Sequence, residues 1–210
     1  MNNLLLVIGL IFVLILISEY LWRIKKTNTE LTRKFIHMSV GIVIAFCPYI
    51  LSWIQLGILA ALFLIVVFAA RTAKLFGSIH KIDRKSYGDL FFAAAILIVM
   101  AITHDKLIFS IAILHLGLAD GLAAVVGTSY GKKSRYKVLN QAKSVAGSLA
   151  FYLCSLILIV FFLLASHDHG AWLAVIWLPV AATIFENVSV YGFDNITVPV
   201  LVALSLRAIS

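Results

Sequence analysis

The chain has 210 residues, of which 63% are hydrophobic and 12% are charged. A soluble domain cannot bury that much apolar surface, so the composition excludes an ordinary soluble protein and indicates an integral membrane protein. The formal net charge of +8 gives no reason to expect nucleic-acid binding, because membrane proteins concentrate Lys and Arg in their cytoplasmic loops.

The apolar segments are continuous rather than alternating, which predicts helices and not a β-barrel. In chain order we expect helices over residues 3–23, 35–50, 54–70, 88–103, 107–127, 145–165, 172–191 and 196–208. The first segment is too long for a signal-peptide core and is expected to be retained. Pro48 and Pro199 argue against straight second and eighth spans. The prediction is an all-α, multi-pass membrane bundle with seven or eight transmembrane helices and a single domain over residues 1–210.

The basic residues predict the orientation of this bundle. Of the 17 Lys and Arg residues, only Lys106 and Arg207 lie outside three of the connections between helices. Such an imbalance predicts that the basic connections are cytoplasmic and that the N-terminus is outside. The cytoplasmic loops are expected near residues 24–34, 71–87, 128–144 and 192–195.

Asp120 lies inside the fifth predicted helix, about 12 Å below its cytoplasmic end at 1.5 Å per residue. A carboxylate inside a membrane helix costs about 2.5–3.5 kcal/mol on insertion scales, so it needs a partner or a function. Asp89, Glu186 and Asp194 are expected at a similar depth, and gathered carboxylates repel one another unless a cation joins them. Oxygen ligands of this kind suit Mg²⁺ with bound phosphates. The alternative for Asp120 is a structural ion pair with His37 or a lysine.

Small residues continue from the fifth helix into a basic loop. Close helix packing explains many of them, but a turn from Gly127 to Gly131 that is followed by Lys132 can also hold phosphate. Lys143 and Ser144 stand at the start of the sixth helix, where free N–H groups and the helix dipole favour anions. For the other basic residues of this loop, contact with lipid headgroups is the better interpretation.

His37 follows Arg33 by four residues, so the two share one face of the second helix. A histidine there can bind phosphate or accept a proton. It can equally be a packed side chain with one hydrogen bond, and the sequence leaves both interpretations open.

Four segments in this order resemble the polyprenol kinase family, which contains dolichol kinase, phytol kinase and CTP-dependent diacylglycerol kinase. They read RKFIHMSVG, LADGLAAVVGTSYGK, NQAKSVAGSLAF and FENVSVYGFDNITVP, and they span residues 33–199. The resemblance implies an enzyme that transfers the γ-phosphate of CTP to a membrane-embedded lipid alcohol at the cytoplasmic face. It also implies kinship with CTP:phosphatidate cytidylyltransferase, which is the alternative function, although the long C-terminal signature of that enzyme is not visible. A small transporter ranks third, because the polar residues lie toward one face and no inverted repeat is apparent.

The resemblance also implies a set of site residues, carried over by position. The residues expected to carry catalysis are Asp120, Lys143, Asp89 and His37. The residues expected to bind the nucleotide are Arg33, Lys34, Gly121, Gly127, Gly131, Lys132, Ser144, Gly147 and Ser148. The expected Mg²⁺ ligands are Asp120, Glu186, Asp194 and Asn195.

The expected partners are a lipid alcohol, CTP as the phosphoryl donor, Mg²⁺ and membrane lipids, without nucleic acid. The compact chain favours a prokaryotic plasma membrane, with the active site facing the cytoplasm. Which lipid alcohol is used, and the oligomeric state, do not follow from the sequence.

Overall fold

The computed structural model describes residues 2–23, 29–72, 87–139, 141–166 and 172–210. Its longer helices are α1 (Asn2–Arg23), α2 (Thr29–Phe46), α3 (Trp53–Thr72), α5 (Gly88–Ile102), α6 (Lys106–Leu114), α7 (Asp120–Tyr130), α8 (Val145–Ser166), α9 (Ala174–Val188) and α10 (Asp194–Ile209). The predicted all-α fold is confirmed, and the predicted helices are found with bounds that differ by a few residues. The loop predicted near 24–34 is shorter than predicted, because residues 29–34 already belong to α2, and residues 24–28 lie outside the described residues. Most of the loop predicted near 71–87 also lies outside the described residues.

Four helical segments are long and apolar enough to cross a membrane: Asn2–Leu21, Leu31–Tyr49, Lys106–Lys133 and Val145–Ser166. Three further apolar helices, Trp53–Ala69, Gly88–Ile102 and Ala174–Val188, are shorter. A helix of 15 residues covers only about 22 Å of a hydrocarbon core that is about 30 Å thick. By length and composition, the described residues therefore support a membrane bundle with four candidate spans, fewer than the seven or eight predicted.

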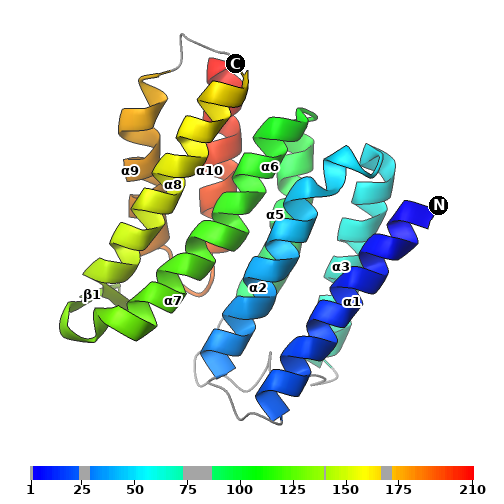
Figure 1. Cartoon of the computed structure of the whole chain (residues 1–210), viewed down its shortest axis with the longest axis horizontal. Helices are drawn as coiled ribbons and strands as arrows, with labels where there is room; N and C mark the ends of the chain where they lie inside the picture. Colours follow the sequence, from blue (N-terminus) through cyan, green and yellow to red (C-terminus); the bar gives the residue numbers. More distant parts are fainter. Residues whose placement is uncertain (1, 24–28, 73–86, 140, 167–171) are drawn as a thin grey trace.

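The helices run side by side (Figure 1). At one end of the bundle lie the C-terminal ends of α1, α3, α7 and α9 and the N-terminal ends of α2, α5, α8 and α10, and both chain termini lie at the opposite end (Figure 1). These helix ends flank the connections that the basic residues predict to be cytoplasmic, and the orientation in the membrane itself stays a prediction.

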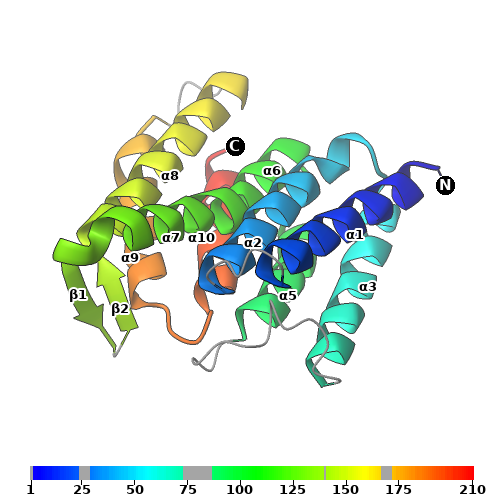
Figure 2. The same cartoon turned by 60° about the horizontal axis from the view of Figure 1, so that its bottom comes forward.

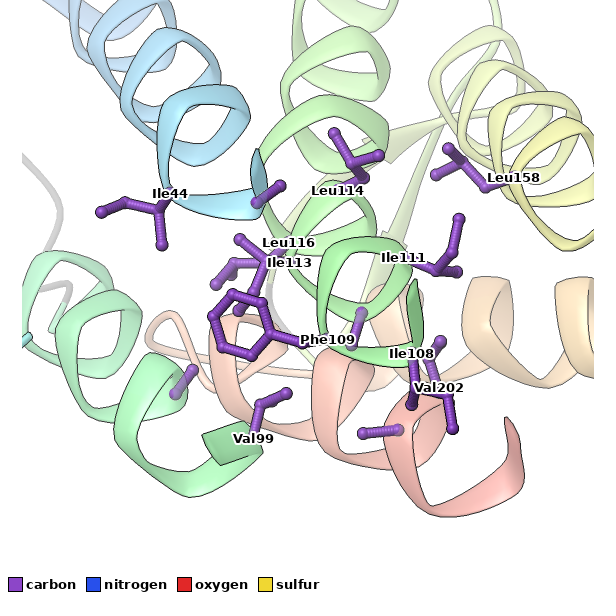
Figure 3. Close-up of a cluster of buried hydrophobic side chains, with 14 of the residues drawn as sticks. Ile44, Val99, Ile108, Phe109, Ile111, Ile113, Leu114, Leu116, Leu158 and Val202 are labelled. Carbon is purple, nitrogen blue, oxygen red and sulfur yellow. The ribbon is translucent and has the colours of Figure 1, made fainter. Parts of the chain in front are cut away.

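α6 lies at the centre of the bundle, and every residue from Ile108 to Leu114 is buried. Around it pack side chains of α2, α5, α8 and α10, among them Ile44, Val99, Leu158 and Val202 (Figure 3). This apolar centre fixes where the polar ends of the surrounding helices meet.

α2 crosses the segment that directly follows α6, and the two backbones are in direct contact there. A Cβ atom on Gly41 would lie 2.7 Å from the Cα atom of Gly117, closer than real Cβ contacts allow. Small residues permit such close crossings in membrane helices, where packing rather than water drives association. Because His37 and Lys34 lie one and two turns before Gly41, and Asp120 lies three residues after Gly117, this crossing brings the three polar side chains together.

A π-helical turn, His115–Ala119, joins α6 to α7. A π-turn inserts one residue, which turns the rest of the helix by about 100°, and such turns are frequent at functional sites. His115 is buried and donates through Nδ1 to the Ile111 carbonyl (2.8 Å), while its Nε2 accepts from the Ser155 hydroxyl (2.9 Å). The turn is thereby tied to α8, and Asp120 follows it directly.

The predicted loop 128–144 contains an element that was not predicted, an antiparallel hairpin of β1 (Arg135–Val138) and β2 (Gln141–Ser144). Figure 2 shows this hairpin projecting from the ends of α7 and α8. Arg135 and Lys137 are exposed, and Tyr136 between them is half-buried. This period of two is the pattern of a strand with one face against the bundle.

Candidate active site

The first polar centre joins α2 to α7. The Lys34 ammonium lies 2.5 Å from the Asp120 carboxylate, and both side chains are 9% exposed. His37 Nε2 lies 3.1 Å from the Leu116 carbonyl oxygen and 3.4 Å from the same carboxylate. Because both neighbours are acceptors, this nitrogen carries the hydrogen. The Lys34–Asp120 contact is the structural ion pair that the sequence offered as the alternative role of Asp120. The His37 ring also packs against Phe92, with the ring centroids 4.5 Å apart.

The second polar centre joins the hairpin to α9. The Lys143 ammonium is bonded to the Glu186 carboxylate and donates to the Glu186 carbonyl oxygen at 2.9 Å. The two side chains are 16% and 7% exposed. A half-buried lysine thus holds a second buried carboxylate at the same end of the bundle.

The two centres act on each other electrostatically. Lys143 stabilises the charge of Asp120, and Asp120 in turn acts on Glu186 and Asp194. Asp194 begins α10, and desolvation together with the neighbouring Asp120 carboxylate raises the pKa of its carboxyl group. Asp120, Glu186 and Asp194 thus belong to one electrostatically coupled region, in which Lys34 pairs with Asp120 and Lys143 with Glu186.

Asn195 follows Asp194 in the first turn of α10. Its Nδ2 donates to the Gly88 carbonyl at 2.7 Å, which leaves Oδ1 buried and without a hydrogen-bond partner among the described residues. A buried acceptor without a partner costs about 1–3 kcal/mol. An oxygen in this state can accept a hydrogen bond from a ligand or bind a cation.

The predicted Mg²⁺ ligands do not form a ready-made cage. Within the described part of the chain, no group of three or more His, Cys, Asp or Glu side chains lies close enough to hold a metal by itself. Mg²⁺ usually takes only one or two protein carboxylates and completes its shell with water and phosphate oxygens. A Mg²⁺ site at Asp120, Glu186, Asp194 and Asn195 that is completed by a polyphosphate therefore stays a prediction.

The predicted phosphate-binding glycines have a packing role in this structure. Gly127 lies within α7 rather than in a turn, and a Cβ there would come within 2.9 Å of the Ser144 hydroxyl. A Cβ on Gly147 would come within 2.8 Å of the Ala123 carbonyl oxygen. The glycine turn therefore begins only at Gly131, and the other small residues let α7 and α8 lie in contact.

Other predicted nucleotide-binding residues are also engaged within the chain. Ser144 ends β2 and accepts from the Gly147 N–H at 3.1 Å, which caps the start of α8. Ser148 pairs with Tyr136 and Asn187. Gly121 packs against Met38. Their predicted contacts with nucleotide stay predictions.

The remaining predicted residues lie at the edge of the region. Asp89 is held by Arg71 at 2.7 Å, and the Arg71 guanidinium also lies over the Tyr87 ring. Arg33 is half-buried and close enough to act on Asp194, while Lys132 is exposed in the turn Gly131–Lys133. The structure thus brings Lys34, His37 and Asp120 together, and it places Asp89 in a separate ion pair.

Sequence reasoning missed two polar features. Glu19 is buried in α1 and pairs with Arg23 at 2.6 Å, next to a Ser18 hydroxyl that is buried without a hydrogen-bond partner among the described residues. An acidic residue inside the first apolar segment was the available signal. The second is the bond from Tyr136 to Asn187 on α9, for which the sequence carries no local signal.

Comparison with known proteins gives one informative relative. The chain is 35% identical over 203 residues to phytol kinase from Synechocystis sp., and the match covers 90% of this chain and 84% of the relative. No family model matches the chain, and no solved structure matches it significantly. The match includes most of both proteins, so it relates the whole fold and not one segment.

Proposed function

The chain belongs to the polyprenol kinase family, the family of phytol kinase, and on this premise we propose that it is a CTP-dependent kinase of a membrane-embedded lipid alcohol. The observation that carries the proposal is the pair of lysine–carboxylate contacts, Lys34 with Asp120 (buried) and Lys143 with Glu186 (partly buried), at one end of an apolar bundle. A lipid alcohol keeps its tail in the bilayer, whereas a nucleotide arrives from water. A charged region at the end of the membrane helices is where the two can meet.

Phosphoryl transfer needs little covalent chemistry from the protein and depends on positioning and charge stabilisation. Asp120, together with Glu186 or Asp194, would hold Mg²⁺, and the Asn195 oxygen would add a neutral ligand. The metal would supply positive charge to the triphosphate oxygens. The chain would supply these oxygen atoms from α7, α9 and the start of α10.

The two lysines neutralise the phosphates. In the structure each of them pairs with a carboxylate. When a cation takes over that balance, the ammonium groups of Lys34 and Lys143 become available to the β- and γ-phosphates at no cost of unpaired buried charge. Lys132 and the turn at Gly131 contact another part of the nucleotide.

The hydroxyl of the lipid alcohol must lose its proton during transfer. We propose Asp89 or His37 as the acceptor. Because His37 Nε2 carries a hydrogen toward the Leu116 carbonyl, its accepting atom is Nδ1. Asp89 can act only if Arg71 releases its carboxylate.

The experiment uses purified protein in detergent with Mg²⁺, γ-labelled CTP or ATP, and a panel of isoprenoid alcohols and diacylglycerol. Label that moves from CTP into the lipid phase, with release of CDP, supports the proposal and identifies the acceptor. Transfer from ATP alone would contradict the choice of donor. Release of pyrophosphate with phosphatidate, without transfer to any alcohol, would assign the chain to the cytidylyltransferases.

A further inference from the structure

The hairpin meets the bundle through two side chains that lie directly opposite each other. Tyr136 on β1 pairs in register with Lys143 on β2. Side chains at paired positions project from the same face of a sheet. Both reach the end of α9, where Lys143 is bonded to Glu186 and Tyr136 to the next residue, Asn187.

The Tyr136 hydroxyl enters a closed hydrogen-bond network. It donates to the Asn187 side-chain oxygen and lies 2.6 Å from the Ser148 hydroxyl, which itself lies 3.0 Å from the same Asn187 oxygen. The Asn187 amide nitrogen donates to the Thr183 carbonyl at 2.9 Å, so the amide is oriented with its oxygen toward the hairpin. Tyr136 thus links β1 to the first turn of α8 and the last turn of α9.

The two contacts differ in what they can do during a reaction cycle. Under the proposed function, Lys143 leaves Glu186 to meet phosphate, so its contact cannot hold the hairpin throughout. The opposite face of β1 carries the exposed side chains of Arg135 and Lys137, which do not support the hairpin from outside. Tyr136 is the contact that can persist while Lys143 changes partner.

We propose that Tyr136 is a positioning residue that holds the hairpin against α8 and α9 and so sets the place of the Lys143 ammonium. The inference rests on the proposed function only in so far as Lys143 meets a nucleotide. Tyr136 does not touch the substrate, and it acts through the strand that carries Lys143.

Steady-state kinetics test this with Tyr136→Phe, which keeps the ring and removes the hydroxyl. The matched control is Tyr130→Phe, because Tyr130 is 80% exposed at the same end of the bundle. We expect the nucleotide KM of Tyr136→Phe to rise about tenfold, the value of one or two lost hydrogen bonds, with the KM for the alcohol unchanged. A fall in kcat alone, with the nucleotide KM of the wild type, would show a purely structural role and overturn the proposal.

A second measurement does not depend on kinase activity. Limited trypsin digestion in detergent, read by mass spectrometry, reports cleavage after Arg135 and Lys137. Tyr136→Phe should be cut there about tenfold faster than the wild type or Tyr130→Phe, because the hairpin leaves the bundle more often. Equal rates in all three proteins would overturn the positioning role even if the protein is an active kinase. Faster cleavage of Tyr136→Phe in a protein without CTP-dependent transfer would support the role of Tyr136 in holding the hairpin and would reject the proposed function.

Discussion

The Lys34 ammonium lies 2.5 Å from the Asp120 carboxylate, although 86 positions of sequence separate the two residues. The close crossing of α2 at Gly41 and the π-turn before Asp120 bring them together. In a buried site such a pair has no solvent to replace either partner, so each charge depends on the other. Variants of this pair can therefore distinguish an effect on stability from an effect on catalysis.

Asp120→Asn should abolish detectable phosphoryl transfer, with a loss of at least about 100-fold, because it removes a charge that stabilises the bound cation and phosphates. The same change leaves Lys34 buried without its carboxylate, which should cost about 3 kcal/mol of stability. Kinase assays and thermal unfolding in detergent measure the two effects.

The control for this prediction is the double variant Lys34→Met and Asp120→Asn, which removes both charges. It should recover most of the lost thermal stability and none of the activity. Recovery of activity in the double variant would contradict a catalytic role for Asp120.

Lys143→Met should raise the KM for the nucleotide by about 100-fold, because the ammonium group meets the phosphates in our account and charged hydrogen bonds contribute about 1.5–3 kcal/mol each. Lys133→Met is the matched control, since Lys133 is exposed in the turn before the hairpin. Nucleotide titrations of the initial rate give both values. Similar KM values for the two variants would argue against a nucleotide contact at Lys143.

Gly41→Ala should disrupt the site from a distance. The new Cβ would lie 2.7 Å from the Gly117 Cα atom, so α2 must move away from the π-turn and carry Lys34 and His37 with it. We expect a lower unfolding temperature together with a loss of activity. Gly9→Ala is the control, because nothing lies within 4 Å of a Cβ at Gly9, and alanine stabilises a helix by up to about 1 kcal/mol relative to glycine.

Asp89→Asn and His37→Gln distinguish the two proposed proton acceptors. Glutamine can still donate to the Leu116 carbonyl, so His37→Gln keeps the hydrogen bond and removes the base. The Arg71–Asp89 pair is partly exposed and contributes little to stability. We expect the variant at the true acceptor to lose at least about 100-fold in kcat and the other to stay within about tenfold. Two nearly active variants would exclude both residues as the base.

The sequence predicts the helices well because each of them is a long apolar run with polar connections. The predicted number of spans is not supported in full, since four helices among the described residues are long and apolar enough to cross a membrane. Apolarity alone does not show that a helix is long enough to span. Gly88–Ile102 and Ala174–Val188 are apolar but have only 15 residues each. The π-turn could not be predicted, because an inserted residue leaves no change in composition.

The candidate site was predicted as a set of residue types rather than as contacts. Asp120, Glu186 and Asp194 act on one another electrostatically, and their role as a shared metal site stays a prediction. The partner of each carboxylate could not be predicted, since Lys34 and Lys143 reach across elements far apart in sequence. The hairpin was missed because each strand has only four residues and a single face in contact with the bundle.

The central claim is tested most directly by following the γ-label of CTP into an extractable lipid phosphate, with phytol as the first acceptor and purified wild-type protein beside the Lys34→Met and Asp120→Asn double variant. The account predicts Mg²⁺-dependent transfer by the wild type, with CDP as the other product, and none by the folded variant. A wild-type protein that leaves the label in water with every alcohol, or a double variant as active as the wild type, would contradict it.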